Sequence, residues 1–243
     1  MTRQFFATLI ILTIYLTSFG QHDFGFKLSG GLSYLSTKVT GIIVDPSISP
    51  PPPKTAQTFF YMPSGQVGLF YNFHFNKQSV FGVELLFSQI EGKEHDKTPA
   101  TDFFGNPTGQ FVTGNNFSHI SYLSIPLYYG YNYKKISVNV GIQTSFLLHA
   151  SSQSKFQAPD YNGNIQTFNS SSSELPLKYF DLGLRGGIIY SLTNKFSIEG
   201  TYYYGLLNIH EHNYSDAGFV YKVQQMTIGI RYKFFMSKPR TEK

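Results

Sequence analysis

The chain has 243 residues, a formal net charge of +5 and 14% charged residues, against about 25% in an average soluble domain. It contains no cysteine, so we expect neither a disulfide framework nor a lipid-modified cysteine anchor, and its basic residues form no block typical of nucleic-acid binding. After the N-terminal leader, no segment approaches the roughly 20 apolar residues that a membrane helix needs.

Residues 1–20 are expected to be a cleaved signal peptide. Arg3 supplies the positive charge, residues 5–16 the apolar core, and Ser18 and Gly20 the small residues before the cleavage site. The alternative is an N-terminal membrane anchor, for which this stretch is short and lacks basic residues on its far side. The mature barrel domain is therefore expected over residues 21–243.

Eight segments of the mature chain alternate apolar residues with small or polar ones, which is the period of a β-strand. One face of each segment is apolar, and no charged residue interrupts it. The strands are predicted at residues 23–35, 65–75, 80–90, 119–131, 135–149, 178–191, 195–208 and 223–235.

The opposite faces favour a membrane barrel over a soluble sandwich or lipocalin. Glycines crowd the polar faces, where a narrow lumen needs small residues. Aromatic residues such as Phe75, Phe81 and Tyr129 gather at strand ends beside tight turns, as in an interfacial girdle. The predicted fold is all-β, an eight-stranded antiparallel up-and-down transmembrane β-barrel after a cleaved signal peptide.

The connections between these strands are alternately short and long. About four residues separate the strands at 76–79, 132–135 and 191–194, whereas 36–64, 91–118, 150–177 and 209–222 are long. Outer-membrane barrels have short periplasmic turns and longer external loops. We therefore expect an outer-membrane location with both termini in the periplasm and the long loops outside the cell.

Four sequence stretches, in order along the predicted strands, resemble a known family. They are Tyr-Leu-Ser-Ile-Pro-Leu at 122–127, Gly141 to Leu148, Phe-Asp-Leu-Gly-Leu at 180–184 with Gly187, and Tyr203 to Ile209. Together they resemble the PorT-like outer-membrane β-barrel family of Bacteroidota, over essentially the whole mature chain. The resemblance implies an outer-membrane barrel in contact with lipid. It also implies a secretion-accessory role with other envelope or secretion proteins as partners.

Charged residues on the polar faces are expected to form a structural network inside the lumen. In an eight-stranded barrel the side chains fill the interior, and buried charges there need partners. Asp181, Arg185, Glu199 and Arg231 lie on three neighbouring strands and form the best candidate cluster. The alternative is a narrow pore or gate for small solutes. The expected interior network comprises Lys27, Glu84, Asp181, Arg185, Glu199 and Arg231, with Lys233 on the same face.

Two groups of residues have types that could bind a metal. They are His210-Glu211-His212, and Glu91 with Glu94, His95 and Asp96. Neither spacing matches a closed metal site, and loops of this kind are usually solvated, so no metal and no cofactor are expected.

The expected function is a structural or interaction role, through the extracellular loops or envelope partners, of a small outer-membrane barrel with a plugged interior. An outer-membrane enzyme is the second alternative, after the narrow pore. His74, His119 and His149 could act as bases, but no spacing ties any of them to a serine and an acid. No catalytic residue is therefore predicted. The proline-rich stretch 49–54 fits either an external contact segment or a spacer without a specific role.

Overall fold

A computed structural model describes residues 21–40, 56–101, 107–159, 164–172, 175–210 and 218–236. These described residues contain no helix long and apolar enough to cross a membrane. The expected signal peptide and the proline-rich stretch 49–54 lie outside them. The strands are β1 (Gln21–Thr40), β2 (Ala56–Phe60), β3 (Met62–His74), β4 (Ser79–Thr101), β5 (Pro107–Tyr133), β6 (Ile136–Pro159), β7 (Ile165–Ser172), β8 (Phe180–Ser191), β9 (Phe196–Gly205) and β10 (Gly218–Met236).

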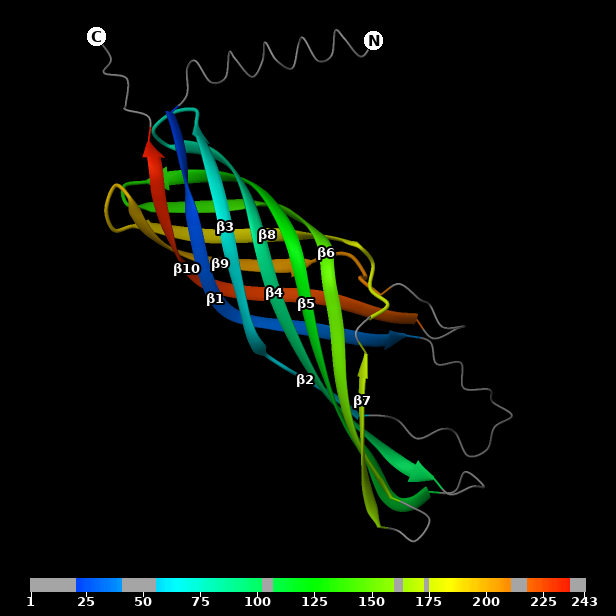
Figure 1. Cartoon of the computed structure of the whole chain (residues 1–243). Coiled ribbons are helices and arrows are strands. Elements are labelled where there is room, and N and C mark those ends of the chain that lie inside the picture. Colours follow the sequence, from blue (N-terminus) through cyan, green and yellow to red (C-terminus); the bar gives the residue numbers. More distant parts are fainter. Residues whose placement is uncertain are drawn as a thin grey trace, which may run out of the picture.

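Eight of these strands form a closed ring (Figure 1). Its order is β1-β3-β4-β5-β6-β8-β9-β10, and β10 returns to pair with β1. Every neighbouring pair is antiparallel. The ring uses the eight predicted strands in the predicted order, so the expected antiparallel up-and-down barrel is confirmed.

The two ends of the barrel differ. At one, here called the turn end, lie the connections 75–78, 134–135 and 192–195 together with Gln21 and Met236. At the other, here called the extended end, β4, β5 and β6 continue beyond the remaining strands (Figure 1). The short β2 pairs with β4 there, and β7 pairs with β6.

Two of the segments that were expected to be long loops, 91–118 and 150–177, consist largely of β-strand. Residues 91–101 and 107–118 are continuations of β4 and β5, and residues 150–159 and 165–172 belong to β6 and β7. These stretches carry polar residues on both faces, so the alternation that marks the spanning strands is absent from them. Backbone pairing between neighbouring strands holds them as a sheet all the same.

The apolar side chains of the ring point outward, the reverse of a soluble barrel. Leu28, Val140 and Ile228 are 57%, 65% and 70% exposed, whereas Lys27 on the inward face is 0% exposed. An exposed apolar belt around a closed barrel is the surface that hydrocarbon requires, because closure leaves no strand edge unpaired in lipid.

At two inward-facing glycines the backbone of the neighbouring strand leaves no room for a side chain. A Cβ atom at Gly68 would overlap the carbonyl oxygen of Leu85, and one at Gly141 would overlap that of Leu127. At the outward-facing Gly200, an added Cβ would meet nothing within 4 Å. The inner wall is thus too crowded for any side chain at these inward positions.

Candidate functional site

Five charged side chains meet in the middle of the lumen. The charged cluster consists of Lys27 on β1, Glu84 on β4, Arg185 on β8, Glu199 on β9 and Arg231 on β10, all between 0% and 2% exposed. Each lies at an inward position of its strand, which is why the period of two brings all of them into the lumen.

Each carboxylate of the charged cluster contacts all three cations. Glu84 lies 3.4 Å from Lys27 Nζ, 2.9 Å from Arg185 Nη1 and 3.1 Å from Arg231 Nη1. Glu199 lies 3.1 Å from Lys27 Nζ, 3.0 Å from Arg185 Nη2 and 3.2 Å from Arg231 Nη1. The cluster therefore joins opposite walls of the barrel by ion pairs.

Two aromatic side chains fill the space around the charged cluster. The guanidinium of Arg231 lies 3.9 Å from the ring centroid of Phe70. Its Nη2 donates a 2.9 Å hydrogen bond to the hydroxyl of Tyr128, which in turn donates to Asn72 Oδ1 at 2.7 Å. Phe70 and Tyr128 are 1% and 2% exposed. Ion pairs and rings together occupy this section of the lumen.

The structure brings five of the six expected network residues together and leaves Asp181 apart. Asp181 lies on the same strand as Arg185, β8, four residues closer to the extended end. Its Oδ2 accepts a 2.7 Å hydrogen bond from Tyr203, and its Oδ1 accepts one from the backbone N–H of Leu182. Of the expected four-residue cluster, Arg185, Glu199 and Arg231 do come together. Only the inclusion of Asp181 was wrong, because the pairing register places Glu84 and Lys27 at the height of Arg185 instead.

Lys233 also lies outside the charged cluster. It pairs with Asp23 at 2.7 Å, and His74 Nε2 lies 3.0 Å from the same carboxylate oxygen. These three side chains form a separate polar group at the turn end.

An apolar layer covers the charged cluster on the side of the extended end. This layer, here called the apolar lid, is made of buried residues of β1, β4, β5, β6, β9 and β10 and of the segments just before β8 and just after β9. Its members are Leu35, Ile90, Ile120, Tyr122, Ala150, Leu177, Tyr203, Ile209 and Val223, each less than 9% exposed. The sequence pattern did not predict the lid. The available signal was a change from polar to apolar residues at the inward positions of several strands, such as Ile90 after Ser88.

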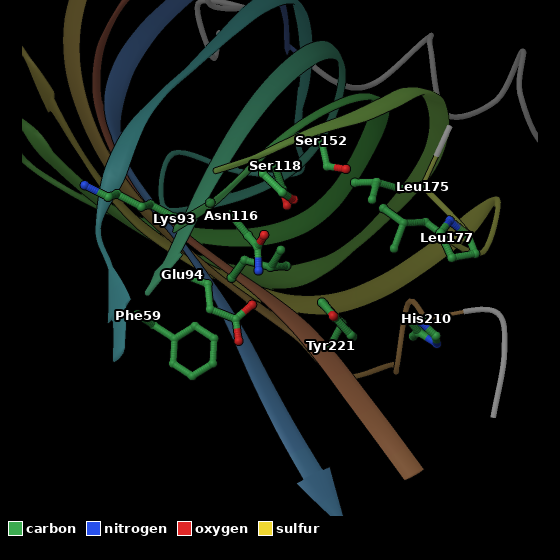
Figure 2. A pocket seen from close by; sticks show the side chains of 14 residues that line it. Phe59, Lys93, Glu94, Asn116, Ser118, Ser152, Leu175, Leu177, His210 and Tyr221 are labelled. Atoms are coloured by element: carbon green, nitrogen blue, oxygen red, sulfur yellow. The ribbon is translucent and has the colours of Figure 1, made fainter. Parts of the chain in front are cut away.

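Beyond the apolar lid, the extended end holds a cavity of about 290 Å³, here called the cup (Figure 2). One wall is polar and comes from β4, β5 and β6, and the other is mostly apolar. The polar wall presents Glu94, Asn116, Ser118, Ser152 and Ser154. The other wall presents Leu35, Phe59, Leu175, Leu177 and Tyr221, with His210 stacked on Tyr221 at 5.0 Å between ring centroids.

Glu94 gives the cup an acid that titrates near neutral pH. Burial, and after it the neighbouring carboxylate of Asp96, together raise the pKa of this carboxyl to about 7. Asp96 Oδ2 accepts a 3.1 Å hydrogen bond from Asn116. A carboxyl of this kind can donate or accept a hydrogen bond toward a molecule in the cup.

The acidic residues and histidines considered as metal ligands do not converge. Glu94 and Asp96 point to the inner side of β4, whereas Glu91 and His95 point outward, where Glu91 lies 3.6 Å from His119. His210 lies at the cup, and Glu211 and His212 lie outside the described residues. Across the described ranges, no three histidine, aspartate or glutamate side chains form a group that could hold a metal ion.

Several solved outer-membrane proteins are similar to this chain. The attachment invasion locus protein Ail of Yersinia pestis is 13% identical, with 88% of this chain and 99% of Ail covered and a TM-score of 0.35. Neisserial surface protein A is 12% identical, with coverages of 87% and 97% and a TM-score of 0.37. OprG of Pseudomonas aeruginosa is 14% identical, with coverages of 88% and 96% and a TM-score of 0.39.

No curated protein matches the chain. A family model does match, and it covers residues 18–211, most of the chain. The inward charges, the outward apolar belt and the closed ring agree with it. The chain belongs to the family described as the outer membrane protein beta-barrel domain.

Proposed function

We propose that this outer-membrane barrel is closed to solutes and acts by binding at its extended end. The observation that carries the proposal is the contrast along the lumen. The charged cluster and the apolar lid fill its middle with side chains that are nearly inaccessible, whereas the cup beyond them is open. The interior then has a structural role, and recognition belongs to the cup and the extended sheet.

We further propose that the extended end lies outside the cell and the turn end in the periplasm. Short turns and both termini on the periplasmic side are the rule for bacterial barrels of this kind. Because the chain has no cysteine, single cysteines introduced at Ser170 and at Gln78 can test this. A membrane-impermeant maleimide on intact cells is expected to label the first and not the second, and the reverse result would overturn the orientation.

A narrow pore is the competing function. The ion pairs across the lumen support a closed barrel, because moving a solute past them would separate buried charges from their partners, at several kcal/mol each. Planar bilayers containing the wild-type protein are therefore expected to show no stable single channels, and liposomes no solute-dependent swelling. Reproducible channels would favour the pore instead.

We also propose that the protein is not an enzyme. Two of the three histidines that could serve as bases contact other groups. His74 contacts Asp23 at the turn end, and His119 contacts Gln89 and Glu91 on the outer face. No serine hydroxyl of the described residues donates a hydrogen bond to either of them. Turnover of lipid or peptide that one serine or histidine substitution abolishes would contradict this proposal.

Cross-linking in the envelope tests the binding role directly. Gln153 pairs with Ser171 across the β6–β7 hairpin, and His95 pairs with Asn115 across the β4–β5 hairpin. Replacing residues 154–170 or 96–114 by a short turn therefore removes the outer part of a hairpin without changing the ring. A variant with a short Gly-Ser insertion between Thr193 and Asn194, at the turn end, is the matched control.

The wild type and the control are expected to cross-link to the same partner, and both trimmed variants are expected to lose it. A partner retained by both trimmed variants would contradict a role of the extended end. The resemblance to PorT-like proteins makes a component of a secretion machinery one candidate partner, and mass spectrometry of the cross-linked product identifies it.

A further inference from the structure

The outer face of the extended sheet is mainly positive, with three lysines against Glu91, which contacts His119, whereas the inner face carries Glu94 and Asp96. The alternation of β4 sends Glu94 and Asp96 toward the cup and Lys93 and Lys97 outward. Lys93 is one of the residues that line the cup, but in Figure 2 its side chain extends away from the other lining side chains, and the adjacent Glu94 turns toward them. Lys155 on β6 has the same outward orientation, since it pairs with Asn115, which in turn pairs with His95.

Aromatic rings surround the outward lysines. Lys93 Nζ lies 5.1 Å from the ring centroid of Phe60 and 5.2 Å from that of Phe117, and Lys97 Nζ lies 4.1 Å from that of Phe111. These rings are 40–44% exposed. No acidic side chain of the described ranges forms an ion pair with any of the three lysines, so their charges stay available to an anion. We call Lys93, Lys97 and Lys155, with the three rings, the lysine face.

The lysine face continues the lipid-facing surface of the barrel. Phe87 and Leu123, paired across β4 and β5, are among its outward apolar residues. Gln89 follows Phe87 on the same face, and Lys93 comes four residues after Gln89, about 13 Å farther along the strand. A strand that leaves the hydrocarbon near Gln89 therefore places Lys93 among the headgroups of the leaflet, with Lys97 farther out.

A groove on the outer surface lies beside these lysines. It has a volume of about 340 Å³ and is lined by Phe117, Gln153, Lys155 and Asn169, together with serines of β6 and β7. Amide and hydroxyl groups next to an ammonium and an aromatic ring are suited to a sugar that carries an anionic group.

We propose that the lysine face binds the phosphate groups of a phosphorylated glycolipid, lipopolysaccharide, in the outer leaflet. The proposal rests on the orientation proposed above and goes beyond binding in the cup, whose polar wall is the inner side of the same strands and which only Lys93 of the lysine face also borders. Lys93 and Lys97 contact phosphates, Lys155 and the groove hold an adjoining sugar, and the rings pack against its apolar edge. A basic side chain near an anionic membrane surface contributes about 1 kcal/mol, or about fivefold in affinity.

The test compares binding of purified protein in detergent to two lipopolysaccharide preparations, one phosphorylated and one enzymatically dephosphorylated. The variants are Lys93→Gln, Lys97→Gln and Lys155→Gln, singly and together. The matched control is Lys134→Gln with Lys135→Gln, at exposed positions of the turn end. Heat-modifiable migration on gels shows that every variant keeps the barrel.

Phosphorylated lipopolysaccharide is expected to bind about fivefold more weakly for each lysine removed, and the control variant is expected to bind like the wild type. The wild type is expected to bind dephosphorylated lipopolysaccharide as weakly as the triple variant binds the phosphorylated form. Equal binding by the wild type and the triple variant would overturn the proposal, and so would an equal loss in the control. Partner cross-linking at the cup is a separate measurement, so failure of one proposal is distinguishable from failure of the other.

Discussion

Glu84 and Glu199 enter the lumen from opposite walls of the barrel, and one guanidinium nitrogen bridges them. Arg231 Nη1 lies 3.1 Å from Glu84 Oε1 and 3.2 Å from Glu199 Oε2. The strands that carry the two glutamates, β4 and β9, are four places apart in the ring of eight. The contact therefore spans the barrel at its middle and depends on closure of the whole ring.

Removing one member of the charged cluster should destabilise the barrel without opening it. Arg185→Ala leaves Lys27 and Arg231 facing the two glutamates, but it breaks two buried ion pairs and, unlike an apolar side chain of similar size, leaves their space empty. Together these losses should cost about 3–5 kcal/mol. We expect the free energy of unfolding in urea to fall by that amount, with no conductance in planar bilayers. Lys195→Ala, at an exposed position in the turn end, is the control and should change stability by less than about 0.5 kcal/mol. A stable Arg185→Ala variant that conducts ions would contradict the structural role of the cluster.

The charge balance of the cluster predicts which substitution within it lowers the free energy of unfolding more. The cluster holds three cations and two carboxylates. Lys27→Met leaves two arginines facing two glutamates and replaces the lysine by an apolar chain of similar length, so its effect on the free energy of unfolding should be close to neutral, within about 1 kcal/mol. Glu84→Gln leaves three cations around one carboxylate and should cost about 3–5 kcal/mol. Parallel urea titrations measure both, and a larger loss for Lys27→Met would show that the cluster is not organised by charge balance.

The ring and its two faces could be predicted because two environments act on alternate residues of each spanning strand. Lipid requires an apolar side chain at positions such as Leu28, and the lumen requires a small or paired polar one at positions such as Lys27. No such constraint acts beyond the membrane. From Gly92 to Lys97 both faces of β4 are polar, so the sequence there resembles a loop although it forms paired strand.

The composition of the charged cluster was harder to predict than its existence. Asp181 was expected in the cluster because its strand neighbours those of Glu199 and Arg231. Residues meet in the lumen only if they lie at the same level along the barrel axis, and the pairing register of the strands sets that level. Asp181 and Arg185 share one strand, so the register that places Arg185 beside Glu84 moves Asp181 toward the apolar lid. Cross-barrel pairs such as Glu84 with Arg231 are far apart both in the chain and around the ring. A one-dimensional pattern carries no signal for them.

Crowding at the inner wall predicts opposite outcomes for two glycine-to-alanine substitutions. At Gly141 an added methyl group would overlap backbone atoms of Leu127 and Tyr128, so Gly141→Ala must displace β5 from β6. At Gly200, on the outer face, the same methyl group meets nothing within 4 Å. Refolding into detergent, followed by the heat-modifiable gel shift, should give a low yield for Gly141→Ala and the wild-type yield for Gly200→Ala. Equal yields would mean that β5 and β6 can adjust at the inner wall to admit a side chain there.

The carboxyl pair at the cup predicts a pH dependence confined to the extended end. Burial and Asp96 raise the pKa of Glu94 from 4.5 to about 7. A carboxyl whose pKa is higher in the folded state contributes stability that is fully present below pH 4.5 and is lost as the pH rises through about 7. Backbone amides near Glu94 and its paired residue Asn116 should therefore exchange hydrogen more readily above pH 7 than below pH 4.5, after correction for intrinsic exchange rates.

Two variants separate this effect from general loosening of the sheet. Glu94→Gln removes the titrating group, so the protection of these amides should become independent of pH over this window. Asp96→Asn removes the neighbouring carboxylate, so the loss of protection should begin at a lower pH than in the wild type. Amides of β8, such as that of Gly186, belong to the spanning wall and should show no change in any of the proteins. If Glu94→Gln kept the full pH dependence, the loosening would have to originate in a group other than the Glu94–Asp96 pair.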